Sequence, residues 1–132
     1  MAIYVIAYSK KKDGNKKVSD NFKVKEFACK DGSDVVFISP QLVRVIQELR
    51  NHFGKPVNIN SGYRTYAYNK KIGGANYSQH TYGTAVDVYI KGVTPKQVAE
   101  YCELISFDEF TPAIVVIIAS TLPPETSGDI FK

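Results

Sequence analysis

The chain has 132 residues, which is enough for one domain with a hydrophobic core and too short for two ordinary domains. Hydrophobic residues make up 44% of the sequence and charged residues 23%, as in ordinary globular proteins. The formal net charge of +4 comes from 17 Lys plus Arg against 13 Asp plus Glu, and this excess alone selects no class of partner.

The N-terminal segment is apolar first and basic afterwards. Residues 3–8 are predicted to form a strand, residues 12–15 a turn, and residues 18–27 a second strand or an extended arm. A cluster of lysines follows the first strand: Lys10, Lys11, Lys12, Lys16, Lys17, Lys23 and Lys25. Such a run is most often a solvated basic hairpin, and the alternative is attraction to a polyanion.

Neither a secretory signal nor a membrane span is expected. The positive charges follow the N-terminal apolar run, whereas a signal peptide needs them before it. The apolar run 113–119 is seven residues long, far fewer than the ~20 that a membrane-spanning helix requires. Cys29 and Cys102 form no CxxC pair and are interpreted as two buried free thiols.

Two helices and three strands are predicted in the rest of the chain. Ser39 as N-cap and Pro40 at the first position begin a helix whose apolar residues recur every three or four positions until Gly54. Residues 57–60 are predicted as a strand, residues 66–71 as a helical turn, residues 84–90 as a strand and residues 94–106 as a helix. Residues 113–119 fit a buried strand and residues 121–128 a loop.

This order of elements predicts an α+β fold, in which two main helices pack on a small, mostly antiparallel sheet. On the strand 84–90 the side chains of Val86, Val88 and Ile90 share one face, and Asp87 lies on the other. An aspartate on such a strand calls for a chemical reason.

His80 and Asp87 are the candidate metal ligands. His80 lies in a loop, and Asp87 follows seven residues later on the predicted strand. Imidazole nitrogen and carboxylate oxygen both bind zinc, at about 2.0–2.2 Å. Gly83 would let the chain bend so that the two side chains converge, and the small Ala85 leaves room beside an ion. Taken alone, such a pair is more often a structural hydrogen bond.

The surrounding motifs change this interpretation. They are Ser61-Gly62-Tyr63-Arg64-Thr65, Tyr68-Asn69, Ile72-Gly73-Gly74-Ala75 and Ser78-x-His80-x-x-Gly83-x-Ala85-x-Asp87. In order and spacing they resemble the zinc D-Ala-D-Ala carboxypeptidase and peptidoglycan endopeptidase family (peptidase M15-like). The resemblance covers about residues 20–105. It is closest to the small single-domain branch found in bacterial and phage wall-hydrolysing proteins.

The resemblance implies a zinc metallopeptidase that hydrolyses amide bonds in peptidoglycan peptides. By position, His80 and Asp87 match two zinc ligands, and Arg64 matches the arginine that faces the carbonyl oxygen of the scissile amide. Ser78 and Gln79 are expected to shape the loop or contact substrate. Tyr63, like Tyr77 and Tyr82, lines a peptide groove or packs in the core.

The C-terminal part departs from the family pattern. The family supplies a third zinc ligand from a histidine on a final strand, often preceded by an acidic general base, but no histidine follows Ser106 here. A truncated or altered C-terminus is expected, with weak or partial zinc binding and an impaired site. The substitutes considered are Glu103, Asp108, Glu109, Glu125 and Asp129. Residues 1–20 are predicted as a basic N-terminal strand or hairpin, residues 21–132 as the peptidase-like domain, and residues 107–132 as its atypical tail.

Two other functions remain open at this stage. The first is a non-catalytic peptidoglycan-binding domain that keeps the groove and Arg64 without stable zinc. The second is a nucleic-acid-binding domain that uses the lysine cluster, but the arrangement of Arg64, His80 and Asp87 gives it no support, so no nucleic acid partner is expected. Anionic wall polymers are the polyanions that fit the resemblance, which places the protein at the bacterial cell wall. It is then phage- or prophage-derived, or reaches the wall by processing or another export route. The sequence leaves the oligomeric state and the exact bond cut open.

Overall fold

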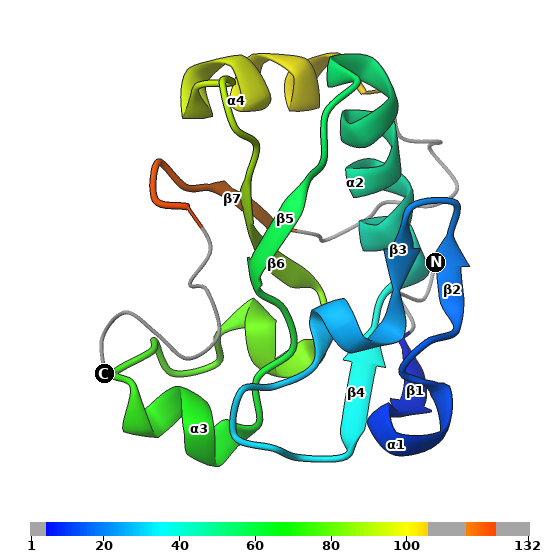
Figure 1. The fold of residues 1–132 in the computed structure, drawn as a ribbon. Helices are drawn as coiled ribbons and strands as arrows, with labels where there is room; N and C mark the ends of the chain where they lie inside the picture. The colour runs from blue at the N-terminus through cyan, green and yellow to red at the C-terminus, as the bar shows by residue number, and fades with distance from the viewer. Residues whose placement is uncertain (1–4, 106–115, 124–132) are drawn as a thin grey trace.

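The computed structural model describes residues 5–105 and 116–123 (Figure 1). In chain order the elements of these residues are β1 (Ile6–Ser9), α1 (Lys10–Asp13), β2 (Lys17–Ser19), β3 (Phe22–Lys23), the 3₁₀ helix η1 (Val24–Phe27), β4 (Val35–Ile38), α2 (Pro40–Phe53), β5 (Asn58–Ser61), α3 (Tyr66–Lys71), the 3₁₀ helix η2 (Gln79–Tyr82), β6 (Ala85–Tyr89), α4 (Pro95–Leu104) and β7 (Val116–Ala119). The predicted α+β class, with two main helices, is confirmed.

The three-stranded sheet β5-β6-β7 is the part of the fold that carries the candidate site. Strands β5 and β6 are antiparallel, with Ser61 opposite Asp87. Strands β6 and β7 are parallel, with Asp87 opposite Ile118. The other strand pairs, β1 with β4 and β2 with β3, are antiparallel, so the predicted mostly antiparallel pairing is confirmed. Asp87 therefore lies on the central strand of its sheet, between β5 and β7.

Helix α2 forms as its sequence predicts. The Ser39 side chain accepts a hydrogen bond from the Leu42 backbone N–H at 3.3 Å, and Pro40 occupies the first turn. Gly54 ends the helix in the left-handed conformation at φ 64°. The apolar face of the helix is buried through Leu42, Val43, Val45, Ile46 and Leu49.

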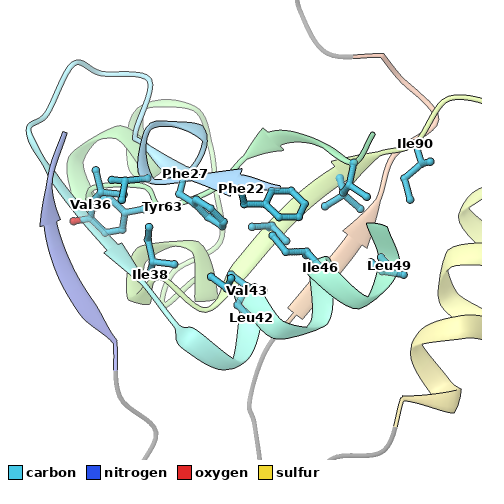
Figure 2. Close-up of a cluster of buried hydrophobic side chains, with 14 of the residues drawn as sticks. Phe22, Phe27, Val36, Ile38, Leu42, Val43, Ile46, Leu49, Tyr63 and Ile90 are labelled. Carbon is cyan, nitrogen blue, oxygen red and sulfur yellow. The ribbon is translucent and has the colours of Figure 1, made fainter. Parts of the chain in front are cut away.

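The hydrophobic core is formed by α2 together with side chains of β3, η1, β4 and β6, and Figure 2 shows part of it, including Phe22, Phe27 and Ile46. Val86 and Val88 of β6 belong to this core and are at most 1% exposed. Because side chains alternate along a strand, Asp87 between them points to the opposite face. Full burial of each large apolar side chain contributes roughly 1.5–3 kcal/mol, and this burial fixes the direction of β6 and hence of Asp87.

Strand β1 overlaps the N-terminal strand predicted for residues 3–8, but this strand does not pair in a hairpin with the next one. β1 pairs with β4, and β2 pairs with β3, so the first two strands do not pair with each other. The expected turn is preceded by the short helix α1, capped by the Ser9 hydroxyl. Asp34 accepts hydrogen bonds from the Ser9 hydroxyl and the Lys11 backbone N–H, both at 2.7 Å, and thereby ties this segment to the start of β4.

Two further predictions, the helix at residues 94–106 and the free cysteines, can be compared with the structure. Helix α4 begins at the Thr94–Gln97 capping box and ends at Leu104, two residues before its predicted end. Both cysteines are free, Cys29 buried and Cys102 half-buried. None of the helices in the described ranges is long and apolar enough to cross a membrane.

Candidate metal centre

A short 3₁₀ helix and a left-handed glycine place His80 near Asp87. The Ser78 hydroxyl caps η2 by accepting a hydrogen bond from the His80 backbone N–H at 3.2 Å. Gly83 then ends η2 at φ 77°, a conformation that L side chains rarely adopt, and the chain turns into β6. The role predicted for Gly83 as the bend is therefore confirmed. His80 is buried, at 4% exposed.

The hydrogen bond of the His80 ring determines which nitrogen faces the site. Nδ1 lies 2.8 Å from the Gly62 carbonyl oxygen, and because a carbonyl can only accept, Nδ1 carries the hydrogen. In the neutral imidazole Nε2 then presents a lone pair. Nε2 lies 3.2 Å from Asp87 Oδ1, and neither atom has a hydrogen-bond partner among the described residues.

This pair of acceptor atoms fits a metal ion. Two lone pairs that face each other at 3.2 Å repel unless a proton or a metal ion lies between them. Two ligand atoms of a tetrahedral zinc ion, each about 2.0–2.1 Å from the metal, lie about 3.3 Å from each other. The carbonyl that holds the far nitrogen of His80 is also the usual outer partner of a metal-bound histidine. The donor types, their separation and their outer contact therefore all suit zinc.

Arg64 is anchored beside the pair by three different side chains. Nη2 lies 3.5 Å from Asp87 Oδ2, Nη1 donates to Asn69 Oδ1 at 3.1 Å, and Nε donates to the Ser61 hydroxyl at 3.2 Å. The Arg64 side chain is 14% exposed, so this is a largely buried ion pair rather than a surface one. Arg64 occupies Oδ2 of Asp87 and leaves Oδ1 free for a second partner.

Asn69 belongs to the site, although sequence reasoning gave it no role. It is 3% exposed, and its Nδ2 donates to the Ala75 carbonyl at 2.9 Å while its oxygen holds Arg64. A Cβ at Gly74 would collide with this side chain. The signal in the sequence was the Tyr68-Asn69 motif followed by two glycines, but the contact itself depends on the fold.

An open cavity of about 580 Å³ collects most of the predicted site residues. Its lining consists of Asn60, Arg64, Ser78, His80, Asp87, Ile118, Ala119, Ser120, Thr121 and Leu122. Asn60, at its wall, is a further residue that sequence reasoning placed only on a strand. The cavity therefore brings together two candidate ligands, an arginine and a loop serine.

Gln79 and Tyr63 are not part of this lining. Gln79 accepts a hydrogen bond from the Thr84 hydroxyl at 2.7 Å, which braces the loop that carries His80. Tyr63 is 8% exposed and packs edge-on against Phe37, with ring centroids 5.4 Å apart. Burial raises the pKa of the Tyr63 phenol. Tyr77 and Tyr82 are exposed at the surface.

Comparison with known proteins identifies the family. A family model described as Peptidase M15 matches residues 18–116. The chain belongs to the peptidase M15 family. A segment of this M15 chain is 41% identical over 44 residues to the zinc D-Ala-D-Ala carboxypeptidase of Streptomyces albus G. The match covers 33% of this chain but only 17% of the carboxypeptidase. No solved structure matches the M15 chain.

The other acidic and histidine side chains of the M15 chain lie elsewhere or outside the described residues. His52 stacks on Tyr101 with ring centroids 3.9 Å apart, between α2 and α4. Glu103 lines an apolar groove formed by α2, α4 and β7. The residues 108, 109, 125 and 129, considered as substitute ligands, are outside the described ranges. Within those ranges, no three His, Cys, Asp or Glu side chains converge.

Proposed function

We propose that this M15 domain hydrolyses amide bonds in bacterial cell-wall peptides in a zinc-dependent reaction. The observation that carries the proposal is the pair of buried acceptors, His80 Nε2 and Asp87 Oδ1, 3.2 Å apart and without hydrogen-bond partners in the described structure. The similarity to a zinc D-Ala-D-Ala carboxypeptidase supports peptidoglycan peptides as the substrate class. His80 and Asp87 would hold the zinc ion.

A zinc ion held in this cavity would polarise the carbonyl of the substrate amide and lower the pKa of water towards ~7. The chain contributes the positioning. The Gly62 carbonyl keeps His80 in the tautomer that directs Nε2 into the cavity. Arg64 holds Asp87 by Oδ2 and thereby directs Oδ1 towards the same point. Each ligand is thus oriented by a contact of its own before any metal binds.

Arg64 also suits the transition state. A guanidinium has five N–H donors, and its contacts with Ser61, Asn69 and Asp87 use three of them. The remaining donors are available to the oxyanion that develops when the amide carbonyl is attacked. Donors of this kind act most strongly when they are fixed beforehand and shielded from water, as this side chain is.

The loop residues and the lysine cluster have proposed supporting roles. Ser78 lines the cavity and is placed to contact the peptide, whereas Gln79 supports the loop through Thr84. The lysines of residues 10–25 would attract anionic wall polymers through long-range electrostatics, so this contribution would weaken as salt increases. Together these proposed roles suit an activity at the cell wall.

Release of peptides from purified peptidoglycan tests the proposal. We expect the zinc-supplemented chain to cut stem or bridge peptides of defined sequence, as followed by mass spectrometry. The His80→Ala variant should be inactive, and His52→Ala should keep the activity because His52 stacks on Tyr101 away from the cavity. Cleavage that survives His80→Ala would contradict the proposal. Sedimentation of the intact chain with peptidoglycan without any cleavage would favour the non-catalytic wall-binding domain.

A further inference from the structure

Three buried acceptor atoms share one cavity. In the described part of the chain, the buried side-chain nitrogen and oxygen atoms without a hydrogen-bond partner are Asn60 Oδ1, His80 Nε2 and Asp87 Oδ1. All three residues line the same cavity. A buried acceptor without a partner is unfavourable, and native structures rarely contain one without a ligand, an ion or a catalytic role. Three of them in a single cavity indicate a shared partner that carries positive charge.

The orientation of the Asn60 amide is fixed by its nitrogen. Nδ2 donates to the Leu122 carbonyl oxygen at 3.1 Å, and because that carbonyl can only accept, the amide cannot be reversed. The Asn60 oxygen is therefore the free end. Leu122 lines the cavity as well, so this hydrogen bond holds the amide at the cavity wall.

A bulge in β5 brings Asn60 next to Asp87. Ile59 pairs with Val88 and Ser61 pairs with Asp87, so β5 advances by two residues while β6 advances by one. Asn60 is the extra residue of this irregularity. Bulges of this kind turn a side chain away from the regular alternation and are frequent beside active sites. Here the bulge places Asn60 beside the strand position of the candidate ligand.

We propose that Asn60 Oδ1 is a third protein ligand of the metal ion that His80 and Asp87 bind. This inference rests on the proposed zinc function of the site. A catalytic zinc ion has three protein ligands and one open position, and the described residues offer a third acceptor in Asn60 but no third His, Cys or carboxylate. An amide oxygen is a neutral, hard donor, so the ligand set carries one negative charge, from Asp87. Such a mixed set should accept Mn²⁺ more readily than a site of three histidines does.

Three variants distinguish a metal-ligand role of Asn60 from a role in supporting the fold alone. Asn60→Ala removes the oxygen and the hydrogen bond to Leu122, whereas Asn60→Asp removes the hydrogen bond but supplies a negatively charged, stronger ligand oxygen. Asn58→Ala is the matched control, because Asn58 lies on the same strand and its Nδ2 also donates to a backbone carbonyl, that of Tyr89 at 3.3 Å, but it does not line the cavity.

The measurement is zinc affinity of the full chain by competition with a chromophoric chelator, with melting curves in the presence and absence of zinc. Asn60→Ala should weaken zinc binding at least about tenfold, since even outer partners of metal sites are worth 10–100-fold in affinity. Asn60→Asp and Asn58→Ala should stay within about threefold of the parent chain or bind more tightly. The zinc-induced rise in melting temperature should shrink in Asn60→Ala alone.

Equal zinc affinity in Asn60→Ala and Asn58→Ala would overturn the inference. In that case, if His80→Ala and Asp87→Ala still abolish binding, the proposed function stands and only the Asn60 role fails. If His80→Ala and Asp87→Ala leave zinc affinity unchanged, the metal site itself fails and the Asn60 inference fails with it.

Discussion

At the scale of single residues, Arg64 connects the parts of the candidate site. Its planar guanidinium contacts Ser61, Asn69 and Asp87 through three different nitrogens. A lysine ammonium is a compact point charge on a flexible stem and cannot reproduce this fork. Arg64 therefore contributes directed hydrogen bonds as well as a positive charge. A substitution that keeps only the charge shows how much the hydrogen bonds contribute.

Arg64→Lys is expected to reduce turnover of a wall peptide by about 10²-fold, the loss typical when one fixed oxyanion donor is removed. Zinc affinity should change by less than about tenfold, because His80 and the free oxygen of Asp87 remain. Steady-state kinetics and chelator competition on the same preparations check both values. Complete loss of zinc binding would show instead that Arg64 serves only to hold Asp87.

The sequence predicted some residues of the candidate site and missed others for physical reasons. His80, Asp87 and Arg64 could be predicted because their chemical types and spacing form a motif. Asn60 and Asn69 could not, because amides have many ordinary uses. The proposed role of Asn60 depends on a bulge, and the position of Asn69 on the close approach of Gly74. Local patterns do not specify contacts of this kind.

At the scale of elements, the junction between η2 and β6 determines whether His80 and Asp87 converge. Gly83 has φ 77°, and a Cβ there would collide with the Phe37 carbonyl oxygen. Gly83 and Gly73 share the same φ, but a Cβ at Gly73 would meet no atom within 4 Å. An alanine at Gly73 would add backbone strain alone, whereas an alanine at Gly83 would add the same strain and a steric collision. Comparing the two substitutions therefore separates the two effects.

Gly73→Ala should destabilise the fold by roughly 1–2 kcal/mol, the usual cost of a left-handed L residue. Gly83→Ala should cost clearly more, because Ser39 donates its backbone N–H to the Gly83 carbonyl at 2.9 Å and β4 leaves little room for movement. Denaturant unfolding of both variants gives the two free energies. Similar losses of unfolding free energy in the two variants would mean that the loop shifts to accommodate the Cβ and that the Phe37 contact does not constrain it.

The predictability of each element follows from the range of its contacts. Helices α2 and α4 were predicted closely because caps, prolines and apolar periodicity are local signals. The pairing of β1 with β4 was missed because β2, β3 and the 3₁₀ helix η1 lie between the two strands in the sequence. No local pattern indicates which strand pairs with β1. The parallel pairing of β7 with β6 is likewise a long-range contact.

At the scale of the whole molecule, the two faces of the β5–β6 pair face different surroundings. One face packs Val86 and Val88 into the core, and the other presents Asp87 to the cavity. A single strand thus links the stability of the fold to the position of a candidate metal ligand. Metal binding to this preformed site should stabilise the folded state in proportion to the logarithm of zinc concentration.

Zinc stoichiometry of the purified chain is the decisive measurement for the proposed metal site. We expect one zinc ion per chain by equilibrium dialysis, loss of binding in His80→Ala and in Asp87→Ala, and retention in His52→Ala, with all variants folded by circular dichroism. Zinc binding that survives both cavity substitutions, or a folded parent chain that binds no zinc, would contradict it.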